Sequence, residues 1–400
     1  MNEPLQRLGE QIARLDREIV DRAKTDEAAR RQMTIPGDVP GSGCYPGRTV
    51  LPLITIRATC ALLALPHSDW VPIGAVQVQR PSCDRSGERS MQHSQPFSRR
   101  RVLCSLAATC AAATMWPLSG TAQQRPVLTR PIPSTSEALP LVGLGTWITF
   151  NVGRDIEARD SCAEVMRAFF EAGGRLIDSS PMYGSSQEVI GYGLQKLGHP
   201  ARLFSADKVW TSSGSAGPSQ IEQSRRHWRV PRFDLLQVHN LLSWEEHLRT
   251  LVAMKAAGEL RYVGITTSEG RRHREFESVM RQHPLDFIQV TYNILDREVE
   301  DRILPLAAER GIGVIVNRPF RQGSLIDRLE RHPLPAWAPE IDTSSWAQFI
   351  LKFILSHPAV TCAIPATTRV DHVRENMAAG TGRLPDAAMR ARMIAYVEGL

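Results

Sequence analysis

The sequence has few long apolar runs, little charge of one sign in its larger part and no closely paired cysteines. No apolar run has the length and flanks of an ordinary membrane-spanning helix, which excludes a polytopic membrane protein. Its 28 glycines and 27 prolines are too few and too aperiodic for a fibrous protein. With 42% hydrophobic and 22% charged residues among 400, the chain can bury a sizeable core, which excludes general disorder.

The positive charge is unevenly distributed along the chain, whose formal net charge is +6. Residues 1–122 contain 15 Lys and Arg against 11 Asp and Glu, whereas residues 123–400 contain 33 against 31. Because the larger part is almost neutral, it lacks the basic surface that a nucleic-acid backbone requires. We therefore expect no nucleic-acid partner.

Cysteine is uneven in the same way. Five of the seven cysteines precede residue 111, and only Cys162 and Cys362 follow. No Cys-x-x-Cys spacing occurs, so the sequence predicts neither a metal site nor a dithiol redox motif. A disulfide between Cys162 and Cys362 is the less favoured interpretation of this pair.

Residues 1–90 form a leader in which little regular structure is expected. Within it, residues 1–33 place leucine and isoleucine at spacings of three and four, which indicates an amphipathic helix. That segment is too short for a stable coiled coil, so a solvated helix is the preferred interpretation. Residues 34–97 are rich in Pro, Gly, Ser and Arg and show no regular period.

Residues 91–122 have the layout of an export signal. A basic cluster, Ser98 to Arg101, is followed by a mildly apolar run from Val102 to Leu118 and then by small residues up to Ala122. Paired arginines before an Ala-rich run resemble a twin-arginine signal. The alternative is a buried Ala-rich helix after a chance arginine triplet. The signal predicts a periplasmic protein without a stable membrane span after cleavage, or a cytoplasmic one if the signal is unused.

The position of this signal suggests a different start of translation. A signal peptide belongs at the N-terminus, whereas this segment begins near Met91. We therefore expect Met91 to be the initiator and residues 1–90 to be absent from the natural protein.

From Leu141 onwards, short apolar runs alternate with helical patterns, of which residues 162–172, 245–257 and 298–308 are examples. Several runs are continuously apolar, as buried parallel strands are. Eight strands alternating with helices in residues 123–400 predict a single-domain (β/α)₈ TIM barrel of the α/β class, with a doubly wound sheet as the alternative. The predicted strands are residues 141–146, 175–178, 203–209, 235–239, 262–266, 287–291, 313–316 and 361–365.

The glycine-rich fingerprint of a doubly wound dinucleotide-binding fold is missing. Gly143 and Gly145 begin the pattern correctly, but Ile148 stands where the third glycine is required. Gly191 and Gly193 fail in the same way, with Lys196 at that position. A nucleotide would therefore bind as it does in barrels, at the carboxyl ends of the strands.

Four polar residues occur at or just after three successive predicted strand ends. Asp178 ends the second strand, Tyr183 follows five residues later, Lys208 lies near the end of the third strand and His239 ends the fourth. Singly, a strand-end aspartate is usually a helix cap, and a loop tyrosine or a lone histidine is usually structural. A lysine in an apolar strand, however, needs a partner. Together the four side chains predict one site at the barrel mouth.

This set resembles the aldo-keto reductase family over about residues 125–400. The matching segments are residues 143–147, 178–188, 208–210, 237–239 and 364–376. The resemblance implies a barrel that reduces aldehydes or ketones with NADPH, or with NADH. It also implies that Tyr183 is the general acid, that Lys208 lowers the pKa of Tyr183, and that Asp178 keeps Lys208 charged. His239 is expected to orient the carbonyl group.

The resemblance also implies residues that hold the nicotinamide. Tyr292 matches an aromatic residue that stacks on the ring, and Gln289 matches an amide that binds the carboxamide. Thr266 and Thr267 stand where the family commonly has Ser-Asn, so that contact is altered. Ordinary packing at the barrel mouth is the alternative role for Tyr292.

The remaining cofactor residues follow the seventh and eighth predicted strands. Asn317 and Arg318 begin the segment that corresponds to the pyrophosphate loop. Glu375 and Asn376 match residues that contact the adenine amide. Two positions where family members place cations for the 2′-phosphate hold alanine and histidine here, but Arg369 is nearby and an arginine fork suits phosphate.

The expected substrate pocket is aromatic. Trp147 and Trp210 stand at family pocket positions, and such walls favour apolar or aromatic carbonyl compounds. The substrate, the direction of the reaction and the oligomeric state do not follow from the sequence.

Two other functions compete with a reductase. One is a cofactor-binding sensor or regulatory protein on the same barrel, which an export signal mildly favours. The other is metal-dependent hydrolysis, which would require His-x-His or clustered carboxylates at strand ends. The complete set of four residues favours the reductase.

Overall fold

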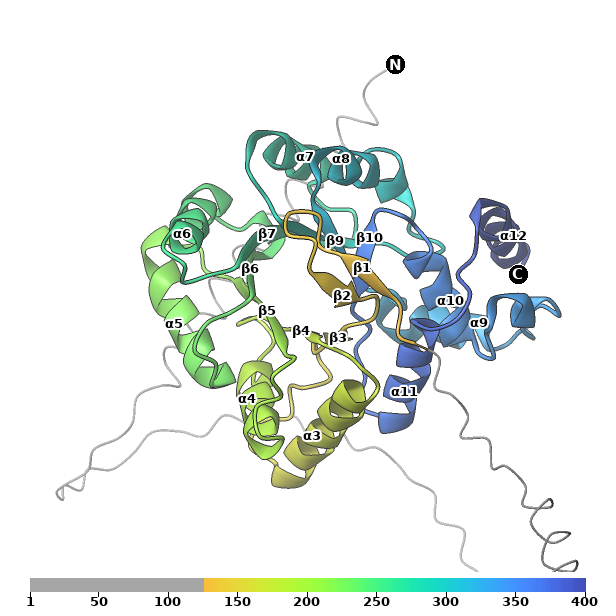
Figure 1. Cartoon of the computed structure of the whole chain (residues 1–400), viewed down its shortest axis with the longest axis horizontal. Helices are drawn as coiled ribbons and strands as arrows, with labels where there is room; N and C mark the ends of the chain where they lie inside the picture. The colour runs from red at the N-terminus through yellow and green to blue at the C-terminus, as the bar shows by residue number, and fades with distance from the viewer. Residues whose placement is uncertain (1–125) are drawn as a thin grey trace, which may run out of the picture. The chain divides into compact units, whose positions relative to one another are not determined.

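A computed structural model describes residues 126–400, and residues 1–125 lie outside the described range. Eight parallel strands form one sheet in the order β10-β9-β8-β7-β6-β5-β4-β3. Parallel bridges from Val142 to Ala363 and from Gly145 to Ala366 join the two edges of this sheet. The sheet therefore closes into a barrel, and its helices lie around the outside (Figure 1). This confirms the predicted (β/α)₈ barrel.

The strand bounds agree closely with the predicted runs. Most of these segments are continuously apolar because both faces are covered, one by the barrel interior and the other by helices. The barrel strands are β3 (Leu144–Gly145), β4 (Leu176–Asp178), β5 (Phe204–Val209), β6 (Leu235–Val238), β7 (Tyr262–Thr266), β8 (Phe287–Thr291), β9 (Gly313–Asn317) and β10 (Val360–Ala363).

The helices connect successive strands or follow the last one. They are α3 (Ile156–Glu171), α4 (Ser186–Lys196), α5 (Gly217–Trp228), α6 (Trp244–Ala256), α7 (His273–Gln282), α8 (Ile303–Arg310), α9 (Ser324–Leu329), α10 (Trp346–Leu355), α11 (Val370–Ala379) and α12 (Ala387–Glu398). Within residues 126–400, no helix combines the length and the apolar character that crossing a bilayer requires.

Two of the predicted helices differ from those observed. Helix α3 begins six residues before Cys162, because Asp155 caps it by accepting a hydrogen bond from the Ala158 amide. The predicted helix over residues 298–308 is divided into a short 3₁₀ turn and α8. Pro305 lacks an amide hydrogen, so it fits only in the first turn of a helix, and α8 accordingly begins two residues before it.

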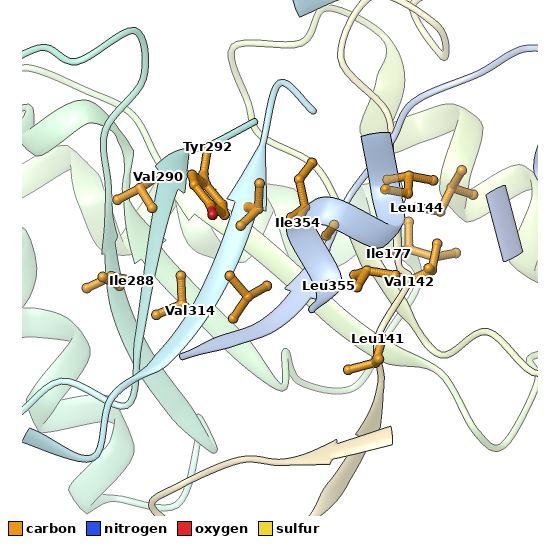
Figure 2. Packing of buried hydrophobic residues seen from close by; sticks show 14 of the residues in the cluster. Leu141, Val142, Leu144, Ile177, Ile288, Val290, Tyr292, Val314, Ile354 and Leu355 are labelled. Carbon is orange, nitrogen blue, oxygen red and sulfur yellow. The ribbon is translucent and has the colours of Figure 1, made fainter. Parts of the chain in front are cut away.

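The core has two parts. Inside the barrel, the inward residues of the strands form one buried cluster, which includes Phe204, Tyr262, Phe287 and Cys362. Outside it, the outward residues pack against the helices, as Ile288 and others do in Figure 2. Both Cys362 and Cys162 are free and buried, so they form no disulfide.

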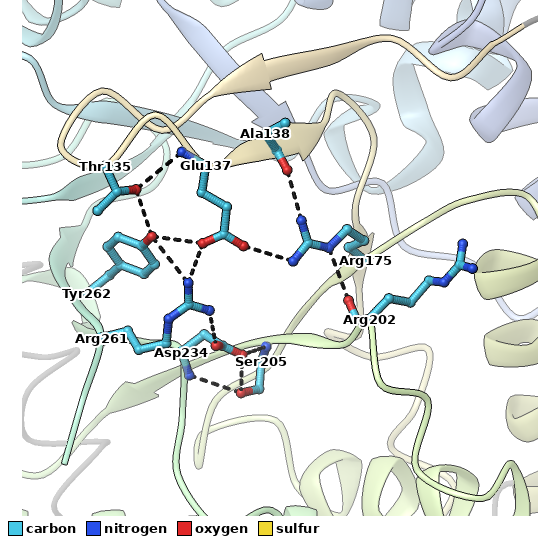
Figure 3. A network of polar contacts seen from close by, with 9 residues as sticks. All are labelled: Thr135, Glu137, Ala138, Arg175, Arg202, Ser205, Asp234, Arg261 and Tyr262. Carbon is cyan, nitrogen blue, oxygen red and sulfur yellow. Dashed lines mark hydrogen bonds and ion pairs between the residues drawn. The ribbon is translucent and has the colours of Figure 1, made fainter. Parts of the chain in front are cut away.

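An antiparallel hairpin, β1 (Thr129–Pro131) and β2 (Ala138–Pro140), precedes the barrel. The turn of this hairpin carries Glu137, which pairs with Arg175 and Arg261 (Figure 3). Both arginines directly precede barrel strands, β4 and β7. The hairpin therefore covers the end of the barrel at which the strands begin and leaves the opposite end to form a site.

Candidate active site

The four predicted catalytic side chains meet at the carboxyl ends of three neighbouring strands. Asp178 is the last residue of β4, Lys208 is the last but one of β5, and His239 directly follows β6. Tyr183 lies in the loop between β4 and α4. These strands pair in parallel, so their carboxyl ends share one edge. Side-chain alternation directs Lys208 inward with Phe204 and Ala206.

Lys208 and Asp178 form a buried ion pair. The Lys208 Nζ atom lies 2.6 Å from Asp178 Oδ2 and 2.8 Å from the Ser179 carbonyl oxygen. The two side chains are only 0% and 3% exposed. Burial lowers the pKa of Lys208, but Asp178, Tyr183 and Asp207 together outweigh burial and leave the pKa above its ordinary value. Lys208 is therefore held protonated beneath the barrel mouth.

The other Asp178 oxygen is also bonded. Gln289 Nε2 donates to Asp178 Oδ1 over 2.9 Å, and Gln237 Nε2 lies 3.5 Å from the same oxygen. A buried carboxylate without such donors would carry a large desolvation cost. Gln289 therefore both lines the mouth and orients the aspartate of the ion pair.

Tyr183 lies directly above this ion pair. Its ring centroid is 5.1 Å from Lys208 Nζ and 6.4 Å from the Trp147 ring centroid. Burial raises the pKa of Tyr183 to about 12, and the Lys208 charge opposes that shift without reversing it. Lys208 thus lowers the pKa of Tyr183 in the expected direction, but burial, which the sequence did not indicate, outweighs it. At neutral pH the phenol holds its proton and can donate it.

His239 lies beside Tyr183. The two ring centroids are 5.8 Å apart and the planes are nearly perpendicular, at 84°. Burial, followed by the charges of Lys208 and Arg271, holds the pKa of His239 well below its ordinary range. The imidazole is therefore neutral, and it can act only through one N–H donor and one lone pair.

A cavity of about 760 Å³ opens above these residues at the barrel mouth. It is large enough for a cofactor fragment together with a small substrate. Of the residues predicted for the cofactor and substrate, those that line it are Trp147, Thr266, Gln289, Asn317, Arg318, Arg369, Glu375 and Asn376.

The structure does not bring Tyr292 to this cavity. Its ring packs in the hydrophobic cluster between the barrel and the helices, where Figure 2 draws it, 5.9 Å from the Phe353 ring. Its hydroxyl group bonds Glu300 and Arg390. Gln289 faces the barrel interior, and a residue three positions later in the same extended segment faces the other side. Tyr292 is therefore a packing residue.

Two further predicted residues also lie outside the cavity lining. The backbone of Trp210 is bonded at both its N–H and its carbonyl group to the Gln220 side chain. The Thr267 hydroxyl donates to the Arg271 carbonyl oxygen over 2.5 Å. Trp147 is thus the predicted pocket tryptophan that reaches the mouth, and Thr267 instead shapes the loop after β7.

Four groups at the mouth have the chemistry to bind an anionic nucleotide. Helix α11 begins at the cavity, and the side chain of its N-cap residue, Arg369, accepts no hydrogen bond from the amide groups of the first turn. Exposed helix N-termini bind phosphate through their amide groups. Arg369 and Arg318 add charge, and Asn376, which is buried, adds a hydrogen-bonding amide at the same rim. This donor set fits a dinucleotide cofactor.

Four residues near the site were not predicted. Ser180 bonds His239, Gln237 approaches Asp178, and Arg271 lowers the pKa of His239. Asp207, next to Lys208, is fully buried on the opposite side of β5, where its carboxylate accepts from Gln187 over 2.7 Å. Strand alternation could have indicated Asp207, because a residue beside an inward lysine must face the helices.

The described part of the chain contains no group of three or more His, Cys, Asp or Glu side chains that could hold a metal ion. The titratable groups that meet at the ends of β4, β5 and β6 are instead one ion pair, one phenol and one imidazole. This composition is that of a proton-transfer site.

The profile of the aldo/keto reductase family matches residues 141–393, a range that contains the whole site. The chain belongs to the aldo/keto reductase family. The predicted set of Asp178, Tyr183, Lys208 and His239 thus lies in a barrel of that family, and the protein is an oxidoreductase.

Curated relatives and solved structures agree with this assignment. Methylglyoxal reductase YeaE of Escherichia coli is 28% identical over 60% of this chain and 85% of that protein. The NADH-specific methylglyoxal reductase of the same species is 26% identical over 64% and 94%. An aldo-keto reductase from Klebsiella pneumoniae, solved in complex with NADPH, shares the fold with a TM-score of 0.57, 24% identity and coverage of 68% and 95%.

Proposed function

We propose that this protein reduces aldehydes or ketones to alcohols with NADPH, or with NADH, at the mouth of its barrel. The observation that carries this proposal is the buried Lys208–Asp178 ion pair beneath Tyr183, with a neutral imidazole beside the phenol. These groups form one proton-donating site, and the anion-binding groups of the rim lie around the same cavity.

Tyr183 supplies the proton in this mechanism. A bound reduced nicotinamide would supply hydride to the carbonyl carbon, so the carbonyl oxygen gains negative charge and requires a proton. The Tyr183 phenol gives that proton as the charge develops and is reprotonated from solvent afterwards. Its raised pKa keeps it in the acid form at neutral pH, which favours reduction over oxidation.

The ion pair stabilises the phenolate that is left behind. When Tyr183 loses its proton, the ammonium group of Lys208 lies close to the new negative charge. Asp178 fixes the position of that ammonium group and is itself fixed by Gln289. Because these groups are already oriented, little reorganisation is needed during the reaction.

His239 positions the carbonyl group. A neutral imidazole offers one N–H group to the carbonyl oxygen while Tyr183 approaches the same oxygen. Two donors on one oxygen both orient it and polarise the bond.

The cofactor residues follow from the cavity lining. Gln289 and Thr266 would contact the nicotinamide end, Asn317 and Arg318 the pyrophosphate, and Asn376 the adenine end. Arg369 would hold a 2′-phosphate, but it already forms an exposed ion pair with Asp371. This competition weakens the case for NADPH and keeps NADH as the alternative cofactor.

We propose a small carbonyl compound as the substrate. Two of the relatives are methylglyoxal reductases, and the mouth offers Trp147 as an apolar wall with the Arg318 guanidinium 5.8 Å above its ring. An apolar wall beside a cation suits a compact carbonyl compound that also carries a polar oxygen.

The direct test is to measure NADPH and NADH oxidation by the full chain with methylglyoxal, aromatic and aliphatic aldehydes, and quinones. Production of one alcohol per cofactor oxidised, abolished by Tyr183→Phe, is the expected result. Cofactor binding without turnover of any carbonyl compound would contradict the proposal and favour a sensor.

We also propose export through a twin-arginine-type signal. The support is the order of basic, apolar and small residues in residues 91–122, which lie outside the described range. N-terminal sequencing of the natural protein should find a chain that begins at residue 123. A mature chain that retains residues 1–90 would contradict both export and initiation at Met91.

A further inference from the structure

Ser180 connects the loop that carries Tyr183 to the imidazole of His239. It is fully buried, two residues after Asp178, and its Oγ lies 2.8 Å from His239 Nδ1. No other hydroxyl group in the described part of the chain forms a hydrogen bond with His239. This bond therefore determines what His239 presents to the cavity.

The surroundings of Ser180 show which atom donates. The Met182 amide donates to Ser180 Oγ over 3.2 Å, so the oxygen already accepts one hydrogen bond. Within residues 126–400, His239 Nδ1 is the one hydrogen-bond acceptor within reach of the hydroxyl proton. If Nδ1 donated instead, that buried proton would have no partner, so the arrangement favours Ser180 as the donor and Nδ1 as the unprotonated acceptor.

Burial and the charges around His239 disfavour the form with both nitrogens protonated. Lys208 and Arg271 are both positive and disfavour an imidazolium ion in this buried position. With Nδ1 unprotonated and the ring neutral, the remaining proton belongs to Nε2. The opposite tautomer would direct a lone pair at the substrate oxygen, which would repel it.

We propose that Ser180 is a positioning residue that holds His239 in the tautomer with its proton on Nε2, so that His239 donates to the substrate carbonyl oxygen. This inference rests on the proposed reductase function. It adds a fifth residue to the site, one that acts through His239 and does not touch substrate.

Ser180 also lies between the two proton donors of the site, Tyr183 and His239, and contacts both. The Tyr183 amide donates to the Ser180 carbonyl oxygen over 3.0 Å, which closes a tight turn with Pro181 at its second position. One end of this turn thus carries the general acid, and the other end bonds His239. Ser180 sets the spacing between Tyr183 and His239 as well as the tautomer.

The tautomer can be read without turnover. Nitrogen-15 NMR of the full chain, labelled at histidine, distinguishes a protonated from an unprotonated ring nitrogen, and loss of the signals in His239→Asn assigns them. We expect an unprotonated Nδ1 and a protonated Nε2 in the wild type, and a mixture of tautomers in Ser180→Ala. A protonated Nδ1 in the wild type would overturn the proposal.

Kinetics supply the second readout. Loss of one oriented hydrogen bond should lower kcat of Ser180→Ala about tenfold, with the cofactor dissociation constant unchanged. Ser180→Thr keeps the hydroxyl group and should restore most of the rate. Ser186→Ala removes a buried hydroxyl that bonds Ser179 instead, and it should leave both rate and tautomer as in the wild type.

The outcomes separate this inference from the proposed function. If the wild type reduces carbonyl compounds but Ser180→Ala is equally fast, only the role of Ser180 fails. If the wild type turns over no carbonyl compound, the reductase function fails, whatever tautomer NMR reports. Should Ser180→Ala not fold, Ser180→Cys has nearly the same shape with a much weaker donor and is expected to show the same direction of change.

Discussion

The two ends of the barrel both contain charged networks, but only one of them is arranged for chemistry. At the end where strands begin, Glu137 pairs with two arginines, Arg175 and Arg261, whose side chains are 27% and 32% exposed. At the opposite end, the Lys208–Asp178 pair is almost fully buried, and an uncharged phenol and imidazole lie against it.

Acidic residues at the two ends respond to their surroundings in opposite ways. Burial raises the pKa of Glu137, but hydrogen bonds from Arg175 and Tyr262, with the charge of Arg261, outweigh it and leave the pKa below its ordinary value. Asp207, beside Lys208, is buried without a cation on its own face, and its pKa is raised to about 7. The carboxylate at the closed end is thus partly exposed and paired with two cations, whereas burial raises the pKa of Asp178 at the mouth and of Asp207 on the helix side of β5.

Breaking the buried ion pair should have the largest effect on stability. Lys208→Met leaves the buried Asp178 without its cation, so we expect the free energy of unfolding to fall by about 3–5 kcal/mol and turnover to be lost. Urea unfolding and steady-state rates measure both. Lys255→Met, which removes a 43%-exposed lysine from Asp286, is the control and should cost less. Equal losses of unfolding free energy in the two variants would show that the buried Lys208–Asp178 pair stabilises the protein no more than a partly exposed pair does.

Removing the charge of Asp207 should stabilise the protein at alkaline pH. The folded protein holds this proton up to about pH 7, whereas the unfolded chain releases it near pH 4, so stability is lost between those values as pH rises. We expect Asp207→Asn to gain up to about 4 kcal/mol over the wild type at pH 8 and nothing at pH 4. A thermal unfolding series against pH tests this. If Asp207→Asn lowered the stability equally at every pH, the hydrogen bonds of the Asp207 carboxylate would matter more than its charge.

Glu137→Gln should show the opposite pH dependence. Its carboxylate contributes stability above its ordinary pKa, and that contribution disappears as pH falls through the lowered pKa of the folded state. We expect the free energy of unfolding to fall by about 1–3 kcal/mol at pH 7, a loss that vanishes as pH falls through the lowered pKa of the folded state, with kcat within about twofold of the wild type. The same thermal unfolding series against pH measures this loss of stability. A large fall in kcat would contradict the claim that the end of the barrel where the strands begin serves stability alone.

The smallest expected effect concerns the choice of cofactor at the rim. Asp371→Asn frees Arg369 from its exposed ion pair, so NADPH should bind about threefold tighter relative to NADH. Arg369→Gln should change the ratio in the opposite direction. Fluorescence titration of both cofactors gives the ratio, and an unchanged ratio in both variants would remove Arg369 from the 2′-phosphate site.

Much of the fold followed from the sequence because its strands are buried on both faces. Continuous apolar runs predicted all eight barrel strands, and the strand-end residues Asp178, Lys208 and His239 came together because parallel neighbours share an edge. The helix bounds that differ from the prediction are those of α3, which begins after the capping residue Asp155, and of α8, whose start is fixed by Pro305.

The predictions that failed depend on two things that a sequence does not specify, which are the direction of a side chain and the balance of burial against nearby charge. Gln289 and Tyr292 are three residues apart, so one face of an extended segment could not hold both, and only Gln289 reaches the mouth. The pKa of Tyr183 depends on the balance of burial against the Lys208 charge, and a sequence contains no measure of burial at that precision. The Ser180–His239 bond depends on loop geometry in the same way.

The most direct test of this account compares Tyr183→Phe with the wild type in three measurements on the same preparation. The substitution removes one hydroxyl group, so the cofactor dissociation constant and the unfolding midpoint should change little, while carbonyl reduction should fall by roughly 10²–10⁴-fold. That result would place the proton transfer at Tyr183. Wild-type turnover in Tyr183→Phe would contradict the central claim, because the proton would then come from another group.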